Sequence, residues 1–321
     1  MTRYLVTGGA GFIGSHVTRR LAQDPDAHII VFDNFCSGRR AHLDEVIDGG
    51  QVEIEVGDLK DLETLVAAAE GVDHAFHFAA NPDIAKAMAD PSVDFWEGTY
   101  LTQNLLEALR RNGVTRLTYA SGSGVYGDVG ELPVVEDMPL RPVSPYGASK
   151  LGCEALISTY CHMFGLRSLA LRFANVVGPQ QTHGVAYDFI RRLRAEPGRL
   201  EIMGDGTQSK SYVHVEDVVD ALLGLFPEGA PRLEVYNIAT QDYLTVREIA
   251  DMVVERLGLS GVEYVFGDEP RGWKGDVPVV RFDSGRARAL GWSNARTSRE
   301  AMAASIDAMV RQVNLEEAAH G

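Results

Sequence analysis

The sequence predicts an α/β fold in which a doubly wound parallel sheet is joined to a smaller, discontinuous α/β lobe. Three observations predict it. Short apolar runs alternate with helix-like segments over the first two-thirds of the 321 residues. A glycine-rich turn follows the first apolar run, and after Asn175 the alternation gives way to loops, short strands and helices. Alternating strands and helices of this kind form a parallel sheet that helices cover on both faces.

The expected strands of the sheet are short, rich in Val, Ile, Leu and Phe, and bounded by turn residues. They are Arg3–Thr7, His28–Asp33, Val52–Val56, His74–Phe78, Arg116–Ser121 and Ser168–Phe173. The expected helices between them are Phe12–Gln23, Leu62–Glu70, Gly98–Arg111 and Tyr146–Phe164. The spacing of these segments suits the right-handed crossover connections that parallel strands require.

The chain after Asn175 predicts the smaller lobe. The helices expected after Asn175 are Tyr187–Glu196, Val215–Phe226 and Thr245–Leu257, and the short strands expected there are Leu200–Met203 and Val235–Ile238. Thr245 and Glu248 have the spacing of a capping box, in which each side chain binds the other residue's backbone N–H group. We expect residues 1–175 and 211–239 to form the sheet domain, and residues 176–210 and 240–321 to form the smaller lobe.

Composition and charge exclude several classes of protein. Lys and Arg total 30 and Asp and Glu total 45, so the net charge of −15 argues against a nucleic-acid partner. Cys36, Cys153 and Cys161 are an odd number without a CxxC pair, so we expect neither a disulfide framework nor a metal site. No apolar run reaches the length of a transmembrane helix, and glycines interrupt the N-terminal apolar stretch too early for a signal peptide. We therefore expect a cytoplasmic protein that does not bind membranes.

The turn between the first strand and the first helix carries Gly8, Gly11 and Gly14, three residues apart. Glycines there let the backbone turn sharply and approach a pyrophosphate, which the helix N-terminus attracts. Asp33 ends the second strand nineteen residues after Gly14, where its carboxylate can accept hydrogen bonds from ribose hydroxyls. Together these features predict a Rossmann-type dinucleotide site. Asp33 favours NAD over NADP because a carboxylate repels a 2′-phosphate.

Residues around this turn leave alternatives open. Arg39 and Arg40 could favour a 2′-phosphate, although solvated loop charge explains them more simply. Asp58 follows the third strand, where it could lie near the adenine amino group or only cap a helix. Ala79 and Ala80 end the fourth strand with small side chains that let a cofactor pass, although packing also explains them.

Tyr146 and Lys150 are four residues apart in a helix that begins at Pro145, so they share one face. A tyrosine hydroxyl, with an ordinary pKa near ~10, is a poor base, but a nearby ammonium and a positive nicotinamide favour the phenolate. A surface helix usually explains such spacing, and the preceding dinucleotide turn makes that explanation less favoured. Ser121 and Ser123 end the fifth strand, where a hydroxyl can relay a proton or orient a sugar, although both are ordinary turn residues.

These motifs resemble the extended short-chain dehydrogenase/reductase family, and most of all its NAD-dependent nucleotide-sugar 4-epimerases of the UDP-glucose/UDP-galactose and UDP-glucuronate kind. The matching stretches span nearly the whole chain in family order: TGGAGFIG, DNF, GDL, HFAAN, SGSGVYGD, PYGASK, RFANVVGP, GDGTQSKSYVHVEDV, YNIA, GDVP and ALGW. The resemblance implies tightly held NAD in the sheet domain and a nucleoside diphosphate sugar in the smaller lobe. We expect a UDP-sugar, with a dTDP-sugar as the alternative. The cofactor-binding residues it implies are Gly8, Gly11, Phe12, Ile13, Gly14, Asp33, Asn34, Asp58, Leu59, Ala79, Ala80, Tyr146 and Lys150.

The same resemblance implies contacts with the substrate. It places Asn175 and Arg271 at the sugar diphosphate and Val185 and Phe189 at the uracil. A turn asparagine, an exposed loop arginine and apolar helix core are the plainer alternatives. The implied substrate-binding residues are Ser123, Tyr146, Asn175, Val185, Phe189, Lys210 and Arg271, and the implied catalytic residues are Tyr146, Lys150, Ser121 and Ser123.

Three positions depart from the family pattern. Lys210–Ser211 replaces a usual Arg-Asp pair, which keeps the positive charge but loses the guanidinium fork. Gly98 replaces an asparagine, which puts one cofactor contact in doubt. Gly122 stands where many relatives carry the relay Ser or Thr, so the relay falls to a flanking serine, to water, or to the tyrosine alone.

The residues just before the Val-Tyr-Gly stretch indicate which reaction to expect. The resembling dehydratases and decarboxylases carry acids just before the Val-Tyr-Gly stretch, where this chain has Ser123 and Gly124. Elimination needs acid and base groups beyond the tyrosine. We therefore expect C4 of UDP-glucose/galactose or UDP-glucuronate/galacturonate to be inverted through a transient 4-keto sugar, with Tyr146 removing and returning the proton. A nucleotide-sugar dehydratase or reductase, and a catalytically silent NAD-binding sensor, are the alternatives.

Two expected helices carry apolar residues with two possible uses. These residues either pack on the sheet or, as the resemblance implies, form a four-helix contact in a homodimer. They are Leu101, Leu105, Leu109, Leu156 and Tyr160. We expect a homodimer.

Overall fold

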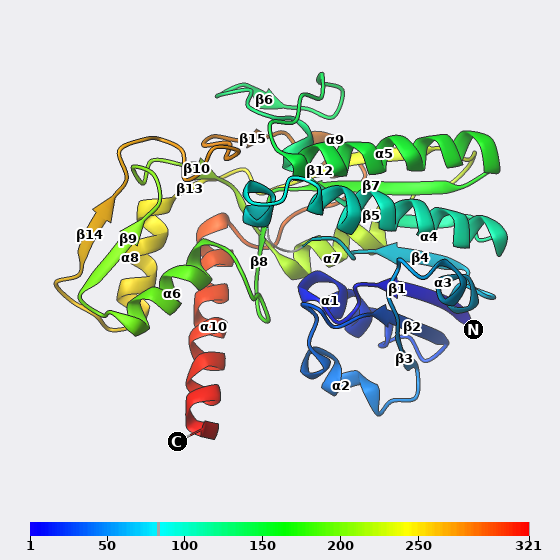
Figure 1. Ribbon diagram of the computed structural model, residues 1–321, viewed down its shortest axis with the longest axis horizontal. Helices are drawn as coiled ribbons and strands as arrows, with labels where there is room; N and C mark the ends of the chain where they lie inside the picture. Colours follow the sequence, from blue (N-terminus) through cyan, green and yellow to red (C-terminus); the bar gives the residue numbers. More distant parts are fainter. Residues whose placement is uncertain (82–83, 321) are drawn as a thin grey trace. The chain divides into compact units, whose positions relative to one another are not determined.

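Seven strands form one sheet within residues 1–81 and 84–320, the part of the chain that the computed structural model describes (Figure 1). They are β1 (Thr2–Thr7), β2 (Ala27–Asp33), β3 (Val52–Val56), β4 (His74–His77), β5 (Arg116–Gly122), β7 (Arg167–Phe173) and β12 (Leu233–Ile238). Their order across the sheet is β12-β7-β5-β4-β1-β2-β3. The registers of β1 with β2 and β4, of β2 with β3, and of β4 with β5 are parallel. The predicted doubly wound Rossmann-type sheet is confirmed.

The strand order reverses at β1, because β2 pairs with one edge of β1 and β4 with the other. In open sheets of this kind, ligands bind beyond the carboxyl ends of the strands at such a reversal. Thr7 ends β1 and Asp33 ends β2. The fold therefore places the glycine-rich turn and the predicted ribose-binding acid at the expected ligand position.

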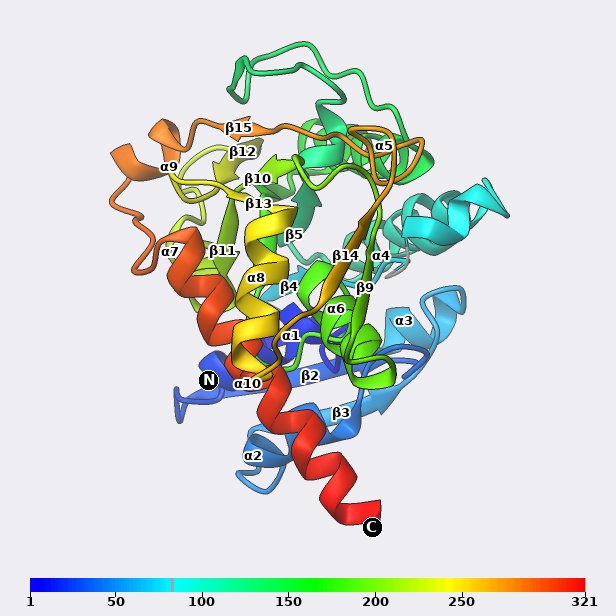
Figure 2. The ribbon, with the colours of Figure 1, turned by 90° about the vertical axis from the view of Figure 1, so that its left-hand side faces the viewer.

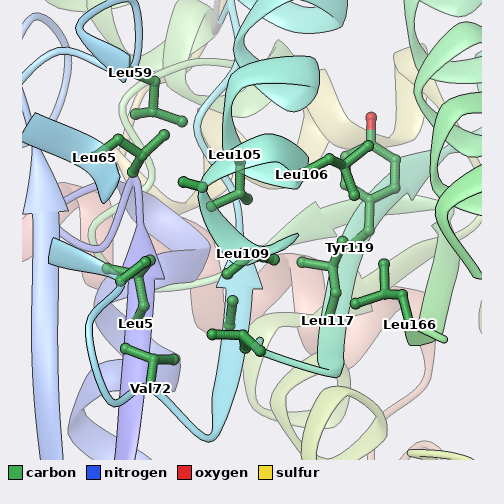
Figure 3. Close-up of a cluster of buried hydrophobic side chains, with 14 of the residues drawn as sticks. Leu5, Leu59, Leu65, Val72, Leu105, Leu106, Leu109, Leu117, Tyr119 and Leu166 are labelled. Atoms are coloured by element: carbon green, nitrogen blue, oxygen red, sulfur yellow. The ribbon is translucent and has the colours of Figure 1, made fainter. Parts of the chain in front are cut away.

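Helices α3 (Leu62–Ala68), α4 (Tyr100–Arg111) and α5 (Pro145–Phe164) pack against the sheet through one buried hydrophobic cluster (Figure 1, Figure 3). The cluster joins Leu5 and Leu117 of the strands to Leu105 and Leu109 of α4. Burying each leucine stabilises the fold by roughly 1.5–3 kcal/mol. This packing fixes α5, which carries the predicted catalytic pair, on the sheet.

Shorter elements connect these parts. Helix α1 (Phe12–Leu21) packs on β1 and β2. The 3₁₀ turns η1 (Arg40–Leu43) and η2 (Ile84–Met88), the helix α2 (Asp44–Ile47), the π-helical turn η3 (Phe95–Thr99) and the 3₁₀ turn η4 (Ser123–Val125) complete this part of the chain. The helix expected from Gly98 thus begins at Tyr100 and is preceded by η3.

The chain divides into two compact units, each built from separate segments. The sheet unit comprises Met1–Val125, Pro142–Arg172 and Val219–Tyr236, and the second unit comprises Tyr126–Arg141, Phe173–Val218 and Asn237–Gly321. This division differs from the expected domain boundaries mainly at residues 126–141, which we expected in the sheet domain. These residues join the second unit because β6 (Pro133–Val134) pairs with β15 (Arg281–Phe282), and Asn237 binds the Val134 carbonyl and the Glu136 carboxylate.

The second unit has its own core between three helices and a pair of strands (Figure 2). Strands β9 (Arg199–Ile202) and β14 (Glu263–Phe266) pair in parallel, and α6 (Val185–Ala195), α8 (Val246–Arg256) and α10 (Ser298–His320) pack beside them. The predicted capping box opens α8. Thr245 Oγ1 accepts from the Glu248 N–H group at 3.1 Å, and Glu248 Oε2 accepts from that of Thr245 at 2.8 Å.

Short pairs of strands complete the second unit. They are β8 (Asn175–Val177) with β11 (Tyr212–His214), and β10 (Ser209–Lys210) with β13 (Leu244–Thr245). Helix α9 (Gly285–Ala289) also belongs to this unit, whereas α7 (Val215–Gly224) begins in it and continues in the sheet unit from Val219 onward. None of the helices in the described ranges has the length and apolar character needed to cross a membrane.

Candidate active site

The glycine-rich turn between β1 and α1 is too tightly packed for other residues. Gly8 has a φ of +70°, and a Cβ on it would lie 2.6 Å from the backbone nitrogen of Ala79. A Cβ on Gly14 would lie 2.2 Å from the carbonyl oxygen of Gly8. Glycine at these positions lets the turn lie against the end of β4 and lets α1 begin directly above it.

The first turn of α1 offers unpaired backbone N–H groups. Gly11 is the N-cap and makes no side-chain cap hydrogen bond, and the first turn, which begins with Phe12 and Ile13, contains no acidic residue. Free N–H groups and the positive end of the helix dipole together form an anion site. The turn therefore fits a pyrophosphate.

Asp33 lies buried beside this turn with its carboxylate already oriented. Its Oδ2 accepts from the Ala10 N–H group at 3.0 Å, and its Oδ1 accepts from the Phe35 N–H group at 2.8 Å. Each oxygen retains a lone pair for a ribose hydroxyl. Next to it along the chain, Asn34 donates to Asp58 Oδ2 at 3.3 Å, so two more predicted cofactor residues contact each other.

The remaining cofactor-side residues follow two further strands of the sheet, β4 and β3, which lie on opposite sides of the β1–β2 pair. Ala79 and Ala80 follow β4 and are half-buried, and Leu59 follows β3 and is buried. Small side chains after β4 leave the sheet edge accessible. These residues and the glycine-rich turn together fit a dinucleotide.

Helix α5 begins with a cap that fixes the start of the helix, which carries the predicted catalytic pair. Ser144 Oγ accepts from the Gly147 N–H group at 3.1 Å, and Pro145 occupies the first helical position. Tyr146 is half-buried, and the Lys150 Nζ atom lies 5.6 Å from the centroid of its ring. The spacing therefore places the two side chains on one face, as predicted.

Lys150 is held by the strand beneath α5. It is buried, and its Nζ donates to the carbonyl oxygen of Ala120 on β5 at 2.7 Å. The same Nζ atom lies 5.0 Å from the centroid of the Tyr119 ring, which adds a cation–π contact. A buried ammonium with one fixed acceptor has a defined position beside Tyr146.

The two candidate relay serines have different surroundings. Ser121 Oγ donates to Glu154 Oε1 at 2.5 Å, within a buried ion pair of Glu154 with Arg172. Ser123, in η4, is half-buried, and its hydroxyl makes no hydrogen bond within the described part of the chain. A Cβ on Gly122, the residue between them, would meet no atom within 4 Å. Of the two serines, Ser123 is the one whose hydroxyl is free to reach a ligand.

The position of Gly98 is part of the π-helical turn η3, which leads into α4. Such turns are frequent at functional sites. Asp94 precedes the turn, is almost fully buried, and accepts from Asn81 Nδ2 at 2.9 Å. Burial raises the pKa of Asp94, while Asn81 and the Lys150 charge oppose that shift.

In the second unit, the two predicted phosphate-binding cations are held by acids. Lys210 Nζ donates to Asp276 Oδ1 at 2.6 Å. Arg271 Nη1 donates to the Asp276 carbonyl at 2.7 Å, and Arg271 Nη2 donates to the Asp128 carboxylate. Asp276 thus contacts both Lys210 and Arg271, and the carboxylates of Asp276 and Asp128 balance the two positive charges.

The other predicted substrate residues have separate positions in that unit. Asn175 is exposed at the start of β8. Phe189 lies in the hydrophobic core, with Val185 half-buried against it on α6. The helix-core alternative therefore describes where Phe189 lies, and the uracil contact of both residues stays a prediction.

Four residues of the site were not predicted from the sequence: Glu154, Arg172, Asp128 and Asp276. Glu154 had one usable signal, since it follows Lys150 by four residues among apolar neighbours and therefore lies on the same buried helix face. No comparable signal linked Asp128 to Arg271, which lies 143 residues away, or Asp276 to Lys210, which lies 66 residues away. Among the described residues, no group of three or more His, Cys, Asp or Glu side chains is placed to hold a metal ion.

Comparison with known proteins gives consistent matches. Residues 4–239 match the NAD dependent epimerase/dehydratase family. The UDP-glucose 4-epimerase of Mycolicibacterium smegmatis is 33% identical over 317 residues, which cover 95% of this chain and 97% of that protein. A crystal structure of a UDP-galactose 4-epimerase is 38% identical, with a TM-score of 0.87 over 97% of this chain and 100% of that one. The UDP-glucose 4-epimerase of Thermus thermophilus, solved with NAD, is 34% identical, with a TM-score of 0.84 over 96% and 99% of the two chains. Sequence and fold thus agree with these proteins along almost the whole chain.

Proposed function

The chain belongs to the NAD dependent epimerase/dehydratase family, and we propose that it is an NAD-dependent epimerase that inverts C4 of a UDP-sugar through a transient 4-keto sugar. The observation that carries the proposal is the fixed Tyr146–Lys150 pair on α5, beside the carboxyl ends of parallel strands. The similarity to UDP-glucose and UDP-galactose 4-epimerases supports the same reaction.

The sheet unit has the residues that hold NAD. The backbone N–H groups at the start of α1 bind the pyrophosphate, and Asp33 binds the adenosine ribose. When bound, NAD supplies the oxidised nicotinamide that takes up a hydride and returns it. Because Asp33 is buried at this point with both oxygens oriented, the site prefers NAD to NADP.

Tyr146 removes the proton of the sugar 4-hydroxyl and later gives it back. The Lys150 ammonium lies close enough to stabilise a phenolate, because an opposite charge favours the ionised form of an acid. Ser123 orients the 4-hydroxyl and relays the proton, since Ser121 donates to Glu154 instead. Because Tyr146 both removes the proton and returns it, no outside proton donor or acceptor is required.

The second unit anchors the substrate through its diphosphate. Arg271 and Lys210 supply positive charge and Asn175 supplies an amide, which are the groups that bind phosphate oxygens. Val185 and Phe189 contact the uracil. A sugar held mainly through its diphosphate can turn and present its other face, which inversion requires.

The residues before the Val-Tyr-Gly stretch argue against the neighbouring reactions. Ser123 and Gly124 leave no acid there to protonate a departing 6-hydroxyl, as a dehydratase needs. A reductase, in contrast, consumes its cofactor, and a silent NAD-binding sensor has no use for the Tyr–Lys pair. Inversion at C4 is the reaction for which these groups suffice.

The test is an NMR time course with UDP-glucose, UDP-galactose, UDP-glucuronate and UDP-galacturonate. We expect one gluco/galacto pair to interconvert at C4 without accumulation of NADH. The matched control is Tyr146→Phe, which keeps the ring and removes the hydroxyl, and which should lower kcat about 10²–10⁴-fold. Turnover of no UDP-sugar, or full activity of Tyr146→Phe, contradicts the proposal.

We further propose a homodimer that forms through η3, α4 and α5. Leu101, Leu105 and Leu109 belong to the core of the chain, so they do not supply this contact. Phe95 and Trp96 are each about half exposed beside α4, and Phe164 is half exposed at the end of α5. Analytical ultracentrifugation of the wild type and of Trp96→Glu tests the proposal, since a charge at that position should shift the protein toward monomer.

A cytoplasmic location is part of the same proposal. Cys36, Cys153 and Cys161 are all free thiols, and free thiols persist in a reducing compartment.

A further inference from the structure

Glu154 is a buried acid on α5 that takes no direct part in the proposed reaction. Its side chain is 5% exposed. Arg172 on β7 binds it twice, with Nε 3.0 Å from Oε1 and Nη2 2.6 Å from Oε2. Ser121, near the end of β5, donates to Oε1 at 2.5 Å. Since β5 and β7 are neighbours in the sheet, one carboxylate connects the helix to two strands.

Glu154 continues the row of side chains that forms the catalytic pair. Tyr146, Lys150 and Glu154 are each separated by four residues, so they lie on one face of α5. Lys150 donates to the carbonyl of Ala120, and the next residue of β5, Ser121, donates to Glu154. Two adjacent residues of β5 thus contact two side chains one turn apart on α5. A shift of the helix along the strand breaks both contacts together.

We propose that Glu154, held by Arg172 and Ser121, is a positioning residue that fixes Lys150 beside Tyr146. A buried carboxylate paired with a buried guanidinium keeps its geometry, because separating the two leaves an uncompensated charge. The hydrogen bond from Ser121 carries this constraint into β5, where the adjacent Ala120 carbonyl orients the ammonium. The inference rests on the proposed function only for the statement that Lys150 and Tyr146 transfer the proton.

Other titratable groups also face Lys150, and their effect on Tyr146 must be distinguished from the effect of Glu154. They are Tyr119 on β5, His77 on β4 and Asp94 ahead of η3. Burial, with a smaller effect of the Lys150 charge, lowers the pKa of His77 to about 3, so His77 stays neutral. Burial raises the pKa of Tyr119 well above its ordinary range, so it stays protonated. A change in the titration of Tyr146 therefore reports mainly on the position of Lys150.

The experiment compares Ser121→Ala and Glu154→Gln with the wild type. The first readout is the ultraviolet phenolate absorbance as a function of pH. Each protein is also titrated with Tyr146→Phe added, and the difference between the two curves isolates the absorbance of Tyr146. The second readout is the pH dependence of kcat with the active UDP-sugar. We expect the phenolate midpoint and the acid limb of kcat to rise by about one pH unit in both variants, because the ammonium is less well placed. KM should change little, since neither residue contacts the substrate.

Ser168→Ala is the matched control. Ser168 is a buried serine on β7 that donates to the Leu117 carbonyl at 2.8 Å, so its loss removes a similar hydrogen bond from the same sheet. It should leave the Tyr146 midpoint unchanged, and an equal shift there would mean that any buried hydroxyl has the same effect, which overturns the proposal.

The remaining outcomes also decide the question. If Ser121→Ala folds normally and titrates like the wild type, Glu154 does not position Lys150. If Glu154→Gln fails to fold, Ser121→Ala decides alone, because it removes one hydrogen bond and leaves the ion pair. The absorbance titration needs no UDP-sugar, so absence of C4 inversion in the wild type would refute the proposed function without affecting this result.

Discussion

The hydroxyl of Ser149 lies where a side chain on residue 98 would begin. A Cβ on Gly98 would lie 2.5 Å from Ser149 Oγ, which is too close for a carbon atom. Ser149 Oγ itself donates to the Asp94 carbonyl at 2.7 Å and lies 2.9 Å from Thr99 Oγ1. The residue that precedes Lys150 therefore holds the π-helical turn η3 in place and explains why this chain carries glycine at position 98.

The first prediction concerns the coupling between these two residues. Gly98→Ala should destabilise the protein by roughly 1–3 kcal/mol, because the added Cβ displaces the Ser149 hydroxyl. In a Ser149→Ala background the same change should cost little or be slightly stabilising, since the nearest remaining atom is then 3.7 Å away and alanine favours helix. Urea unfolding of all four proteins in a double-mutant cycle measures the coupling. Equal costs in the two backgrounds would show that the hydroxyl is not the obstacle.

The second prediction tests which hydroxyl relays the proton. Ser123→Ala should lower kcat about tenfold to a hundredfold, because it removes the hydroxyl that has no hydrogen-bond partner among the residues that the structure describes. Adding Gly122→Ser to that variant should restore part of the activity, since a Cβ on residue 122 meets no atom within 4 Å. Initial rates of C4 inversion, followed by NMR, measure both effects.

The control for this rescue is Gly122→Ala in the same Ser123→Ala background. It adds the same Cβ without a hydroxyl, so it should restore nothing. Equal recovery by alanine and serine would mean that the backbone change, and not the hydroxyl, is responsible. An unchanged kcat for Ser123→Ala would leave water or Tyr146 alone as the relay.

The third prediction concerns stability at acid pH. His74 and His77 are buried on β4, and burial lowers the pKa of each to about 3, with a further contribution from nearby positive charges. In the unfolded chain the pKa of a histidine is near ~6.5, so protonation favours unfolding. The contribution of the two neutral histidines to the free energy of unfolding is complete above that pH, and it falls as the pH drops toward 3. Between pH 8 and pH 5, each of the two histidines should lower the free energy of unfolding by about 2 kcal/mol.

Urea unfolding followed by circular dichroism at pH 8, about 6 and 5 measures this loss. His74→Gln and His77→Gln should each flatten the dependence on pH, whatever their effect on stability at pH 8. His162→Gln is the control, because His162 is exposed on α5 and should leave the slope unchanged. The same slope in all four proteins would assign the acid sensitivity to the carboxylates.

Local patterns allowed the sequence to predict much of the site. The glycine-rich turn, Asp33 at the end of β2 and the Tyr146–Lys150 spacing each depend on residues close together in the chain, and the structure places each at the edge of the sheet. The capping box at Thr245 is predictable for the same reason, since both partners lie within one turn.

Features that depend on distant residues could not be predicted. Ser121 binds Glu154 because Arg172 on another strand holds that acid, and no local pattern reveals this. Residues 126–141 join the second unit through β15, which lies far away in the sequence. Ser149 of α5 holds the turn η3 in place, and the apolar periodicity of α4 does not reveal this contact. The sequence therefore predicted a helix from Gly98, whereas α4 begins at Tyr100.

The last prediction concerns Arg271. In the proposed function its guanidinium must release the Asp128 carboxylate in order to bind the diphosphate of the substrate. Nη2 now donates to the Asp128 carboxylate, and both side chains are roughly one-third exposed. A pair this exposed is worth at most about 1 kcal/mol. Asp128→Asn removes the competing charge, so UDP should bind more tightly, but by no more than about fivefold.

Calorimetric titration with UDP at fixed low salt measures this effect, and three further variants interpret it. Arg271→Gln should weaken binding at least about tenfold, because it removes charge-assisted hydrogen bonds. Asp128→Asn in the Arg271→Gln background should then have no effect, since no guanidinium remains to release. Asp137→Asn, an exposed acid of the same segment that pairs with Arg286, is the control for net charge. If Asp137→Asn tightens UDP binding as much as Asp128→Asn does, long-range charge explains the gain, and Arg271 does not exchange Asp128 for the diphosphate.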